Sequence, residues 1–127
     1  DKMIPKFRAW EPDTKFMNDQ VRVTSNRFGD GEVLVEATDG FGWIEVKIEY
    51  LMQSTGLKDK NGMEIFEGDI VVIKYSEHGY HYYEKIVFEN GTFTAGDEDW
   101  LYNIKDYCVV CGNIYENPEL LEPANEI

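Results

Sequence analysis

Apolar and polar residues alternate along much of this chain at a period of two, which is typical of half-buried β-strands. The clearest alternation in the first half is 43–48, where Ile44, Val46 and Ile48 share one face of the predicted strand. No segment keeps a helical period for longer than about two turns, whereas an ordinary helix runs for about three. The predicted strands are 6–10, 15–17, 21–24, 32–36, 43–48, 70–75, 85–89, 92–95 and 107–115.

Turn signals separate these strands. Two Asn-Gly pairs, at 61–62 and 90–91, predict tight hairpin turns in which both central residues adopt a positive φ. Gly68 predicts a bend that needs the same backbone freedom. Asp69, next to this bend, is expected to accept hydrogen bonds from backbone amides, as aspartates in turns do.

Helix signals are few and short. Segment 49–53 fits either an extended conformation or one helical turn, and segment 100–104 fits either another strand or a short turn. A short helix is predicted to begin at Asn117-Pro118, with Asn117 as the N-cap and Pro118 in the first helical position. Short strands with frequent turn signals predict an all-β fold with minor short helix, either a small barrel or a sandwich of antiparallel strands.

The size and composition fit one soluble domain over residues 1–127. A chain of 127 residues with 43% hydrophobic and 14% aromatic residues carries enough apolar material for a core, which argues against intrinsic disorder. Asp1 and Lys2 precede Met3, where family-like sequence starts, and we interpret them as a cloning remnant. Residues 123–127 are expected to form a frayed tail.

The formal net charge of -13 comes from 25 acidic and 12 basic residues. This charge repels nucleic-acid phosphates, and the basic residues are scattered and do not form a groove, so nucleic-acid binding is disfavoured. No apolar stretch is long enough to span a bilayer, and no signal peptide opens the chain. With only two cysteines, the protein is expected in the cytoplasm of a bacterial host, away from membranes.

Three segments in order resemble one known family. The central run 51–71, LMQSTGLKDKNGMEIFEGDIV, resembles the central motif of the YopX family. The opening 6–10, KFRAW, and the closing 112–121, GNIYENPELL, resemble the two ends of the same family. The resemblance implies a mainly β protein of phages and prophages, in a family whose biochemical role is uncharacterised. It supplies no catalytic residues to carry over.

A C-x-x-C pair is the first candidate site. Cys108 and Cys111, with His78 and His81, could supply four tetrahedral zinc ligands. The cysteines lie in a predicted strand, however, where residues three apart point to opposite faces. We therefore interpret them as two small thiols rather than a zinc or redox site. The sequence does not say whether the four side chains come together in space.

Two acidic groups form further candidates. Asp97–Asp99, a run of three acids before Trp100, could bind a divalent cation through oxygen ligands. Its spacing matches no calcium loop, so a solvated loop is the preferred interpretation. Glu64, Glu67 and Asp69 could pair for acid–base chemistry, but they surround the predicted bend at Gly68.

The second half of the chain is rich in phenol and indole side chains. They are Tyr75, Tyr80, Tyr82, Tyr83, Trp100, Tyr102 and Tyr107. Such side chains could stack nucleic-acid bases or anchor a protein interface, and the negative charge favours the interface. Packing within the fold explains them equally well, because aromatic residues favour strands.

No catalytic motif is present, so we predict a non-enzymatic protein with no cofactor and no catalytic, cofactor-binding or metal-ligating residues. The preferred hypothesis is a phage or prophage accessory protein acting through protein–protein contacts with a phage or host protein, or through self-assembly as a homo-oligomer. One alternative is a nucleic-acid module on a small SH3-like barrel, supported by Lys74, Tyr75 and Lys85. A weaker alternative is an acidic DNA mimic that inhibits a host enzyme.

Overall fold

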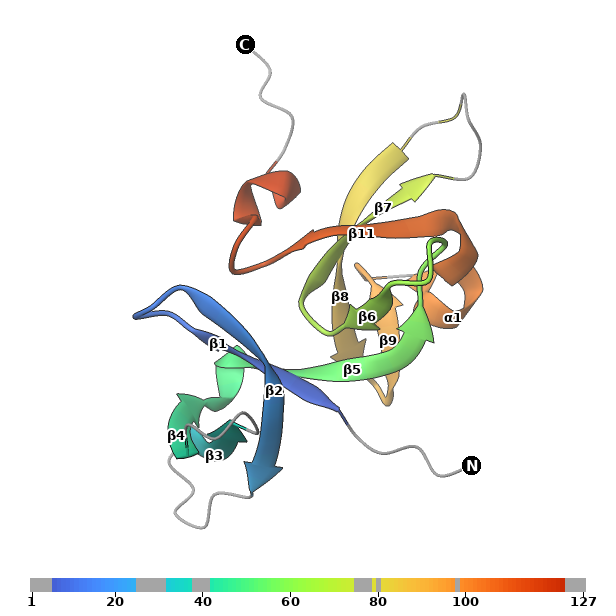
Figure 1. Cartoon of the computed structure of the whole chain (residues 1–127). Helices are drawn as coiled ribbons and strands as arrows, with labels where there is room; N and C mark the ends of the chain where they lie inside the picture. Colours follow the sequence, from blue (N-terminus) through green and yellow to red (C-terminus); the bar gives the residue numbers. More distant parts are fainter. Residues whose placement is uncertain are drawn as a thin grey trace. The chain divides into compact units, whose positions relative to one another are not determined.

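The computed structural model of the chain (Figure 1) describes residues 6–24, 32–37, 42–74, 79, 81–97 and 99–122. Among these residues strands predominate, and every strand pair with an assigned register is antiparallel. One sheet is curled into a half-barrel. The predicted fold class, mainly β with minor short helix, is therefore confirmed.

The elements follow one another closely. The strands are β1 (Phe7–Glu11), β2 (Phe16–Thr24), β3 (Glu32–Ala37), β4 (Gly42–Lys47), β5 (Leu51–Lys58), β6 (Glu64–Phe66), β7 (Asp69–Lys74), β8 (His81–Glu89), β9 (Thr92–Ala95), β10 (Asp99–Trp100) and β11 (Cys108–Asn113). The helical elements are η1 (Ile48–Tyr50), α1 (Leu101–Ile104), η2 (Lys105–Tyr107) and η3 (Pro118–Leu121). None of these helices among the described residues has the length and apolar character needed to cross a membrane.

The chain divides into two compact units, Asp1–Ser54 and Thr55–Ile127. The strands form a six-stranded sheet in the order β4-β3-β2-β1-β5-β6 and a five-stranded sheet in the order β10-β9-β8-β7-β11. The boundary between the units falls within β5, so this strand begins in the first unit and ends in the second.

In the first unit β1 to β4 form a meander, and β1 pairs with both β2 and the start of β5. Ala9 and Trp10 are both buried, although strict alternation places them on opposite faces. The prediction that Ile48 shares a face with Val46 is wrong: Val46 is buried, but the chain turns into η1 at Ile48, whose side chain is 60% exposed. The side chain of Ile44 lies outside the described residues.

A single strand, β2, replaces the two predicted at 15–17 and 21–24. Its polar middle suggested a break between two strands, but Asn18 is buried and pairs across to Ala9. The register of β1 and β2 shifts between Phe7 and Ala9. This irregularity accommodates the polar stretch within one continuous strand.

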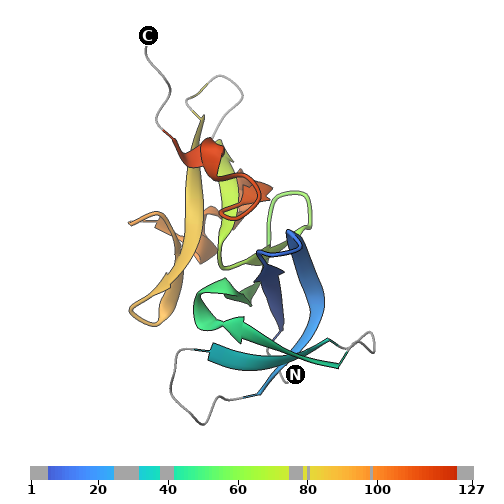
Figure 2. The ribbon, with the colours of Figure 1, turned by 90° about the vertical axis from the view of Figure 1, so that its left-hand side faces the viewer.

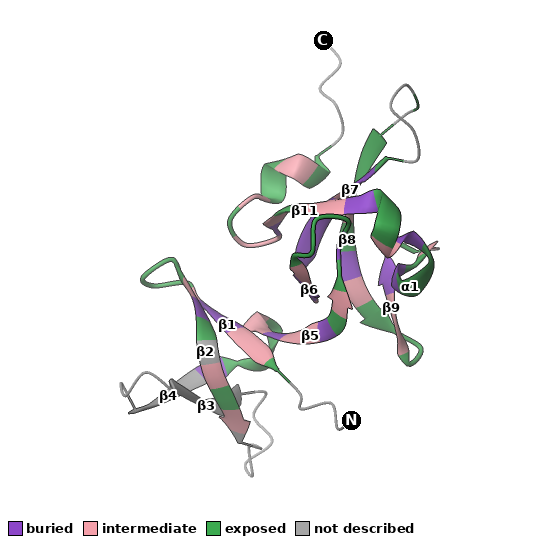
Figure 3. Cartoon of the chain, turned by 45° about the vertical axis from the view of Figure 1, so that its right-hand side comes forward, coloured by how far each residue is buried: buried purple, intermediate pink, exposed green. Residues whose placement is uncertain are grey.

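Buried residues of the second unit lie on β6, β7, β8, β9, β11 and α1 (Figure 3). Cross-strand partners on the same face supply this core, for example Ile73 with Cys108 and Ile86 with Ala95. The buried members are Ile65, Val71, Ile73, Ile86, Ala95, Leu101, Ile104 and Cys108. The segment 100–104, ambiguous in the sequence, is mostly the short helix α1, because Leu101 and Ile104 reach this core from successive turns.

The two Asn-Gly turns differ. Asn90 and Gly91 have φ values of 53° and 81°, as predicted for a tight hairpin between β8 and β9. In the other pair only Gly62 has a positive φ, so the prediction of two left-handed residues is wrong there. The loop between β5 and β6 is longer than a tight hairpin, since β5 ends at Lys58 and β6 starts at Glu64.

The close of the chain corrects the predicted helix cap. A 3-10 helix, η3, does begin at Pro118, but the Asn117 side chain does not cap it. Its Oδ1 instead accepts a hydrogen bond from the Asn113 amide at 3.2 Å, and Asn113 Oδ1 accepts bonds from the amides of Tyr115 and Glu116 at 3.0 and 2.9 Å. The closing motif is therefore a side-chain-stabilised turn that follows β11.

Several predictions concern residues that lie outside the described ones. These are the remnant at Asp1 and Lys2, the tail 123–127, and the side chains of Tyr75, His78, Tyr80 and Glu98.

Candidate functional site

A cavity of about 400 Å³ lies in the second unit, where β8 passes the turn between β9 and β10. The short helix η3 packs against β8 and contributes Leu121 to the cavity wall. The lining residues are Tyr82, Glu84, Lys85, Ala95, Gly96, Asp97, Asp99 and Leu121. Ala95 also belongs to the core, so the base of the cavity rests on packed structure.

The long strand β8 pairs with β7 along one edge and with β9 along the other, over different parts of its length. Its residues His81 to Lys85 pair with β7, whereas Ile86 to Glu89 pair with β9. The Gly96 amide donates to the Lys85 carbonyl at 2.9 Å, and beyond it the chain turns away into β10. Figure 2 shows β9 beside only part of the long β8 ribbon.

The backbone conformation at Gly96 favours glycine, and a larger residue would also displace the Glu84 carboxylate. The φ of +66° lies in the left-handed region, and a Cβ placed there would lie 2.8 Å from the Glu84 carboxyl carbon. The Glu84 carboxylate therefore packs against the backbone of the turn. Thr94 fixes the same turn by donating from its hydroxyl to the Gly96 carbonyl at 2.9 Å.

Carboxylates dominate the charge of the cavity. Glu84, Asp97 and Asp99 contribute three, against one ammonium from Lys85. Within the described ranges no three Asp, Glu, His or Cys side chains are grouped closely enough to hold a metal ion. Tyr82 and Leu121 add apolar surface beside the acids, a combination that suits an organic cation.

Exposed aromatic residues lie next to the cavity in sequence. Trp100 and Tyr102 directly follow Asp99 and are 60% and 70% exposed. Tyr83, between two lining residues on β8, is 41% exposed. All five residues of the aromatic second half that the structure describes are at least 37% exposed: Tyr82, Tyr83, Trp100, Tyr102 and Tyr107. Exposed side chains of this kind can contact a partner.

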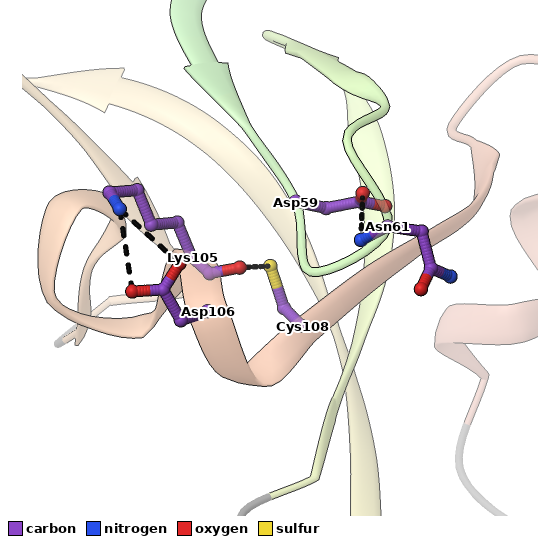
Figure 4. A network of polar contacts seen from close by, with 5 residues as sticks. All are labelled: Asp59, Asn61, Lys105, Asp106 and Cys108. Atoms are coloured by element: carbon purple, nitrogen blue, oxygen red, sulfur yellow. Dashed lines mark hydrogen bonds and ion pairs between the residues drawn. The ribbon is translucent and has the colours of Figure 1, made fainter.

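The C-x-x-C pair is split between the core and the surface. Cys108 is fully buried, and its thiol donates to the Lys105 carbonyl at 3.6 Å (Figure 4). Burial, with the negative charges of Asp59 and Asp106, raises the pKa of Cys108 to about 12. Cys111 is exposed at the bulge of β11. Burial and Asp69 also raise its pKa, so neither thiolate is favoured.

Among the described residues, His81 forms no metal cluster with these thiols. His81 is exposed at the start of β8, opposite Lys74 of β7, while His78 lies outside the described residues. The two cysteines among the four zinc-ligand candidates occupy different environments: Cys108 is buried and Cys111 is exposed.

Asp59, which the sequence did not single out, is the most connected carboxylate of the loop between β5 and β6. It is only 5% exposed, and its Oδ1 accepts from the amides of Asn61 and Met63 at 2.8 and 2.9 Å. Its Oδ2 accepts from the Val110 amide at 2.8 Å. The contact with Asn61 is drawn in Figure 4. The signal was an aspartate ahead of an Asn-Gly pair, a position that favours side-chain bonds to turn amides.

The bend at Gly68 follows the prediction. Gly68 has a φ of 87°, and buried Asp69 accepts a hydrogen bond from the Phe66 amide at 2.7 Å. Glu64 and Glu67 are half-buried beside it. Asp59 and Asp69 both accept hydrogen bonds from backbone amides, within the central motif and, for Asp59, also from Val110 of β11. This is a structural use, distinct from the carboxylates that line the cavity.

The chain belongs to the YopX protein family, which it matches over residues 6–122. It is also similar to a solved structure, the protein EF1440 from Enterococcus faecalis, with a TM-score of 0.71 and 32% sequence identity. That similarity covers 95% of this chain and 100% of the other. No curated protein matches the chain.

Proposed function

We propose that this YopX-family chain is a non-enzymatic accessory protein of a phage or prophage, acting in the host cytoplasm by binding another protein. The observation that carries the proposal is the cavity beside β8, whose lining residue Asp99 is followed in the sequence by the largely exposed Trp100 and Tyr102. Large exposed aromatic side chains are common anchors of protein interfaces. The raised thiol pKa values and the structural roles of Asp59 and Asp69 favour no catalytic role for these groups.

The nucleic-acid alternative finds less support. Lys85, one of its three residues, lies among the carboxylates of the cavity, and Lys74 is exposed opposite His81. Three acids around one lysine repel a phosphate backbone. Binding to a partner protein with basic or mixed surface fits the same charges better.

Affinity purification from a host carrying the phage or prophage tests this proposal. Wild-type protein should retain a specific partner at constant stoichiometry, and the Trp100→Ala, Tyr102→Ala double variant should lose most of it. The control is Phe16→Ala, because Phe16 is also an exposed aromatic residue, 55% accessible, but lies in the first unit. Retention that is equal for all three proteins, or no retention, contradicts the proposal.

Self-assembly is a second form of protein contact that the same surface could serve. Light scattering over a wide concentration range measures it. A mass that rises above 14.8 kDa in wild type and stays monomeric in the double variant would identify a second copy of the chain as the partner. A strict monomer directs the search to phage or host proteins.

A further inference from the structure

We propose that the cavity and the adjoining edge of β8 bind an extended peptide segment of the partner, with a lysine or arginine side chain in the cavity. This inference rests on the proposed function and specifies the occupant of its site. It combines three observations on the second unit: a strand edge without a partner among the described strands, a cavity beside that edge, and the charge of the cavity lining.

The strand edge supplies the main-chain contacts. From His81 to Lys85, β8 pairs on one side with β7, and none of the described strands pairs on the other side. The Lys85 carbonyl faces that second side, since it accepts from Gly96. Backbone groups of alternate residues point to the same edge, so the N–H and C=O groups of Tyr83 face it as well. An extended peptide can add there as a further strand.

The cavity supplies the specificity. In an added strand, alternate side chains point to one side, so one of them can enter the space beside the edge. A volume of about 400 Å³ is at the lower end of the range of ligand pockets, roughly 300–1,000 Å³. Such a space accommodates one long side chain more readily than an aromatic cluster or a folded surface.

Charge decides which side chain enters. The three carboxylates of Glu84, Asp97 and Asp99 exceed the single ammonium of Lys85, and an acidic peptide side chain would meet net repulsion. Tyr82 and Leu121, each 37% exposed, offer apolar surface to the methylene stem of a lysine or arginine. A tyrosine ring also attracts a cation at its face. The occupant is therefore an extended segment that presents a basic side chain.

Synthetic peptides test the inference directly. Three blocked seven-residue peptides of alternating valine and threonine carry lysine, norleucine or glutamate at the central position. Binding to the full chain is followed by amide chemical shifts in NMR titrations. We expect the lysine peptide to bind about tenfold more tightly than the glutamate peptide, with the norleucine peptide between them. The shifts should concentrate on Tyr83 and Gly96.

Two variants locate the interaction. The Glu84→Gln, Asp99→Asn double variant should weaken the lysine peptide by about fivefold or more, and reduce the difference between the three peptides. The matched control Glu89→Gln changes an exposed carboxylate on the same strand, within the part paired to β9, and should leave all affinities unchanged. Amide spectra of each variant without peptide report whether it keeps its fold.

Several outcomes overturn the inference: equal binding of lysine and glutamate peptides, no shift at Tyr83 at millimolar lysine peptide, or equal losses in the double variant and the control. Shifts of the same amides with protein concentration alone would show that a second copy of the chain occupies the edge instead. The broader proposal of partner binding is decided separately by the purification experiment, so a negative peptide result leaves that result standing.

Discussion

Replacement of Asp59 by alanine offers the sharpest test of how the central motif stabilises the fold. The carboxylate accepts three backbone hydrogen bonds, two from its own loop and one from Val110 of β11. A hydrogen bond to a charged group contributes about 1.5–3 kcal/mol. Asn61 and Met63 are exposed, however, so water can replace the carboxylate at their amides. We therefore expect a total loss of about 3 kcal/mol, most of it from the Val110 amide.

Urea unfolding followed by circular dichroism measures this loss. With a urea slope of about 1–3 kcal/mol per molar, typical of small proteins, the midpoint should fall by roughly 1–3 M. Asp59→Asn should have a smaller effect, because the side-chain oxygen of asparagine can still accept a hydrogen bond. Some loss should remain, because its NH2 group cannot accept a bond from the other backbone amides.

Asp106→Ala is the matched control. The Asp106 side chain is 76% exposed and pairs with Lys105 at 3.3 Å (Figure 4), and removal of such a surface pair should change the stability by less than about 1 kcal/mol. A loss below about 1 kcal/mol for Asp59→Ala, or a comparable loss for Asp106→Ala, would refute the reasoning that the three backbone bonds stabilise this loop.

Three further predictions follow from the same structure. Gly96→Ala should cost about 1 kcal/mol more than Gly91→Ala in urea unfolding, because both positions have a positive φ but only at Gly96 would a Cβ meet the Glu84 carboxyl group; equal losses would contradict this. The Cys108 pKa, raised from 9.0 to about 12, means that the unfolded chain loses the thiol proton first as the pH rises. The stability should therefore fall above pH 9 by up to about 1.4 kcal/mol per pH unit relative to Cys108→Ala, and parallel profiles would show that burial does not hold the proton. The interpretation of residues 1–127 as a single domain predicts one cooperative thermal transition, with calorimetric and van't Hoff enthalpies in agreement; two transitions would assign separate stabilities to the two units.

Local signals predicted the turns and strands that depend on neighbouring residues. The hairpin at Asn90-Gly91 and the strand 92–95 match the structure because turn type and alternation are properties of a few adjacent residues. The backbone bond to Asp69 was predicted for the same reason. The resemblance to the YopX family, carried by segments at both ends and the centre, is also confirmed.

Predictions failed where distant residues decide the local conformation. The Asn61-Gly62 loop is set by Asp59 and, through it, by Val110, which is 51 residues away in the sequence. Asn117 bonds the Asn113 amide instead of capping η3, and a sequence window shows both choices as equally good. The polar middle of β2 suggests a break between two strands. This prediction failed because the burial of Asn18 depends on the neighbouring strands.

The candidate site was only partly accessible to sequence analysis. Asp97, Asp99 and Tyr82 were each considered, but as separate acidic and aromatic groups. Their meeting at one cavity depends on the pairing of β8 with β9 and on the packing of η3 against β8, the second of which joins residues far apart in the sequence. Glu84 was not predicted as a site residue, because nothing in the sequence places its carboxylate against Gly96.

The bond between Asp59 and Val110 also bears on the order in which the chain can fold during its synthesis. A ribosome adds about 5–20 residues per second, so the 51 residues that separate the two partners take roughly 3–10 s to translate at that rate. During this interval the loop of the central motif lacks its β11 partner, and β7 lacks β11, one of its two neighbouring strands. The central motif therefore lacks part of its native contacts until β11 has been synthesised. A nascent chain stalled before residue 110 should be digested by protease within 59–74, whereas a chain released at full length should resist.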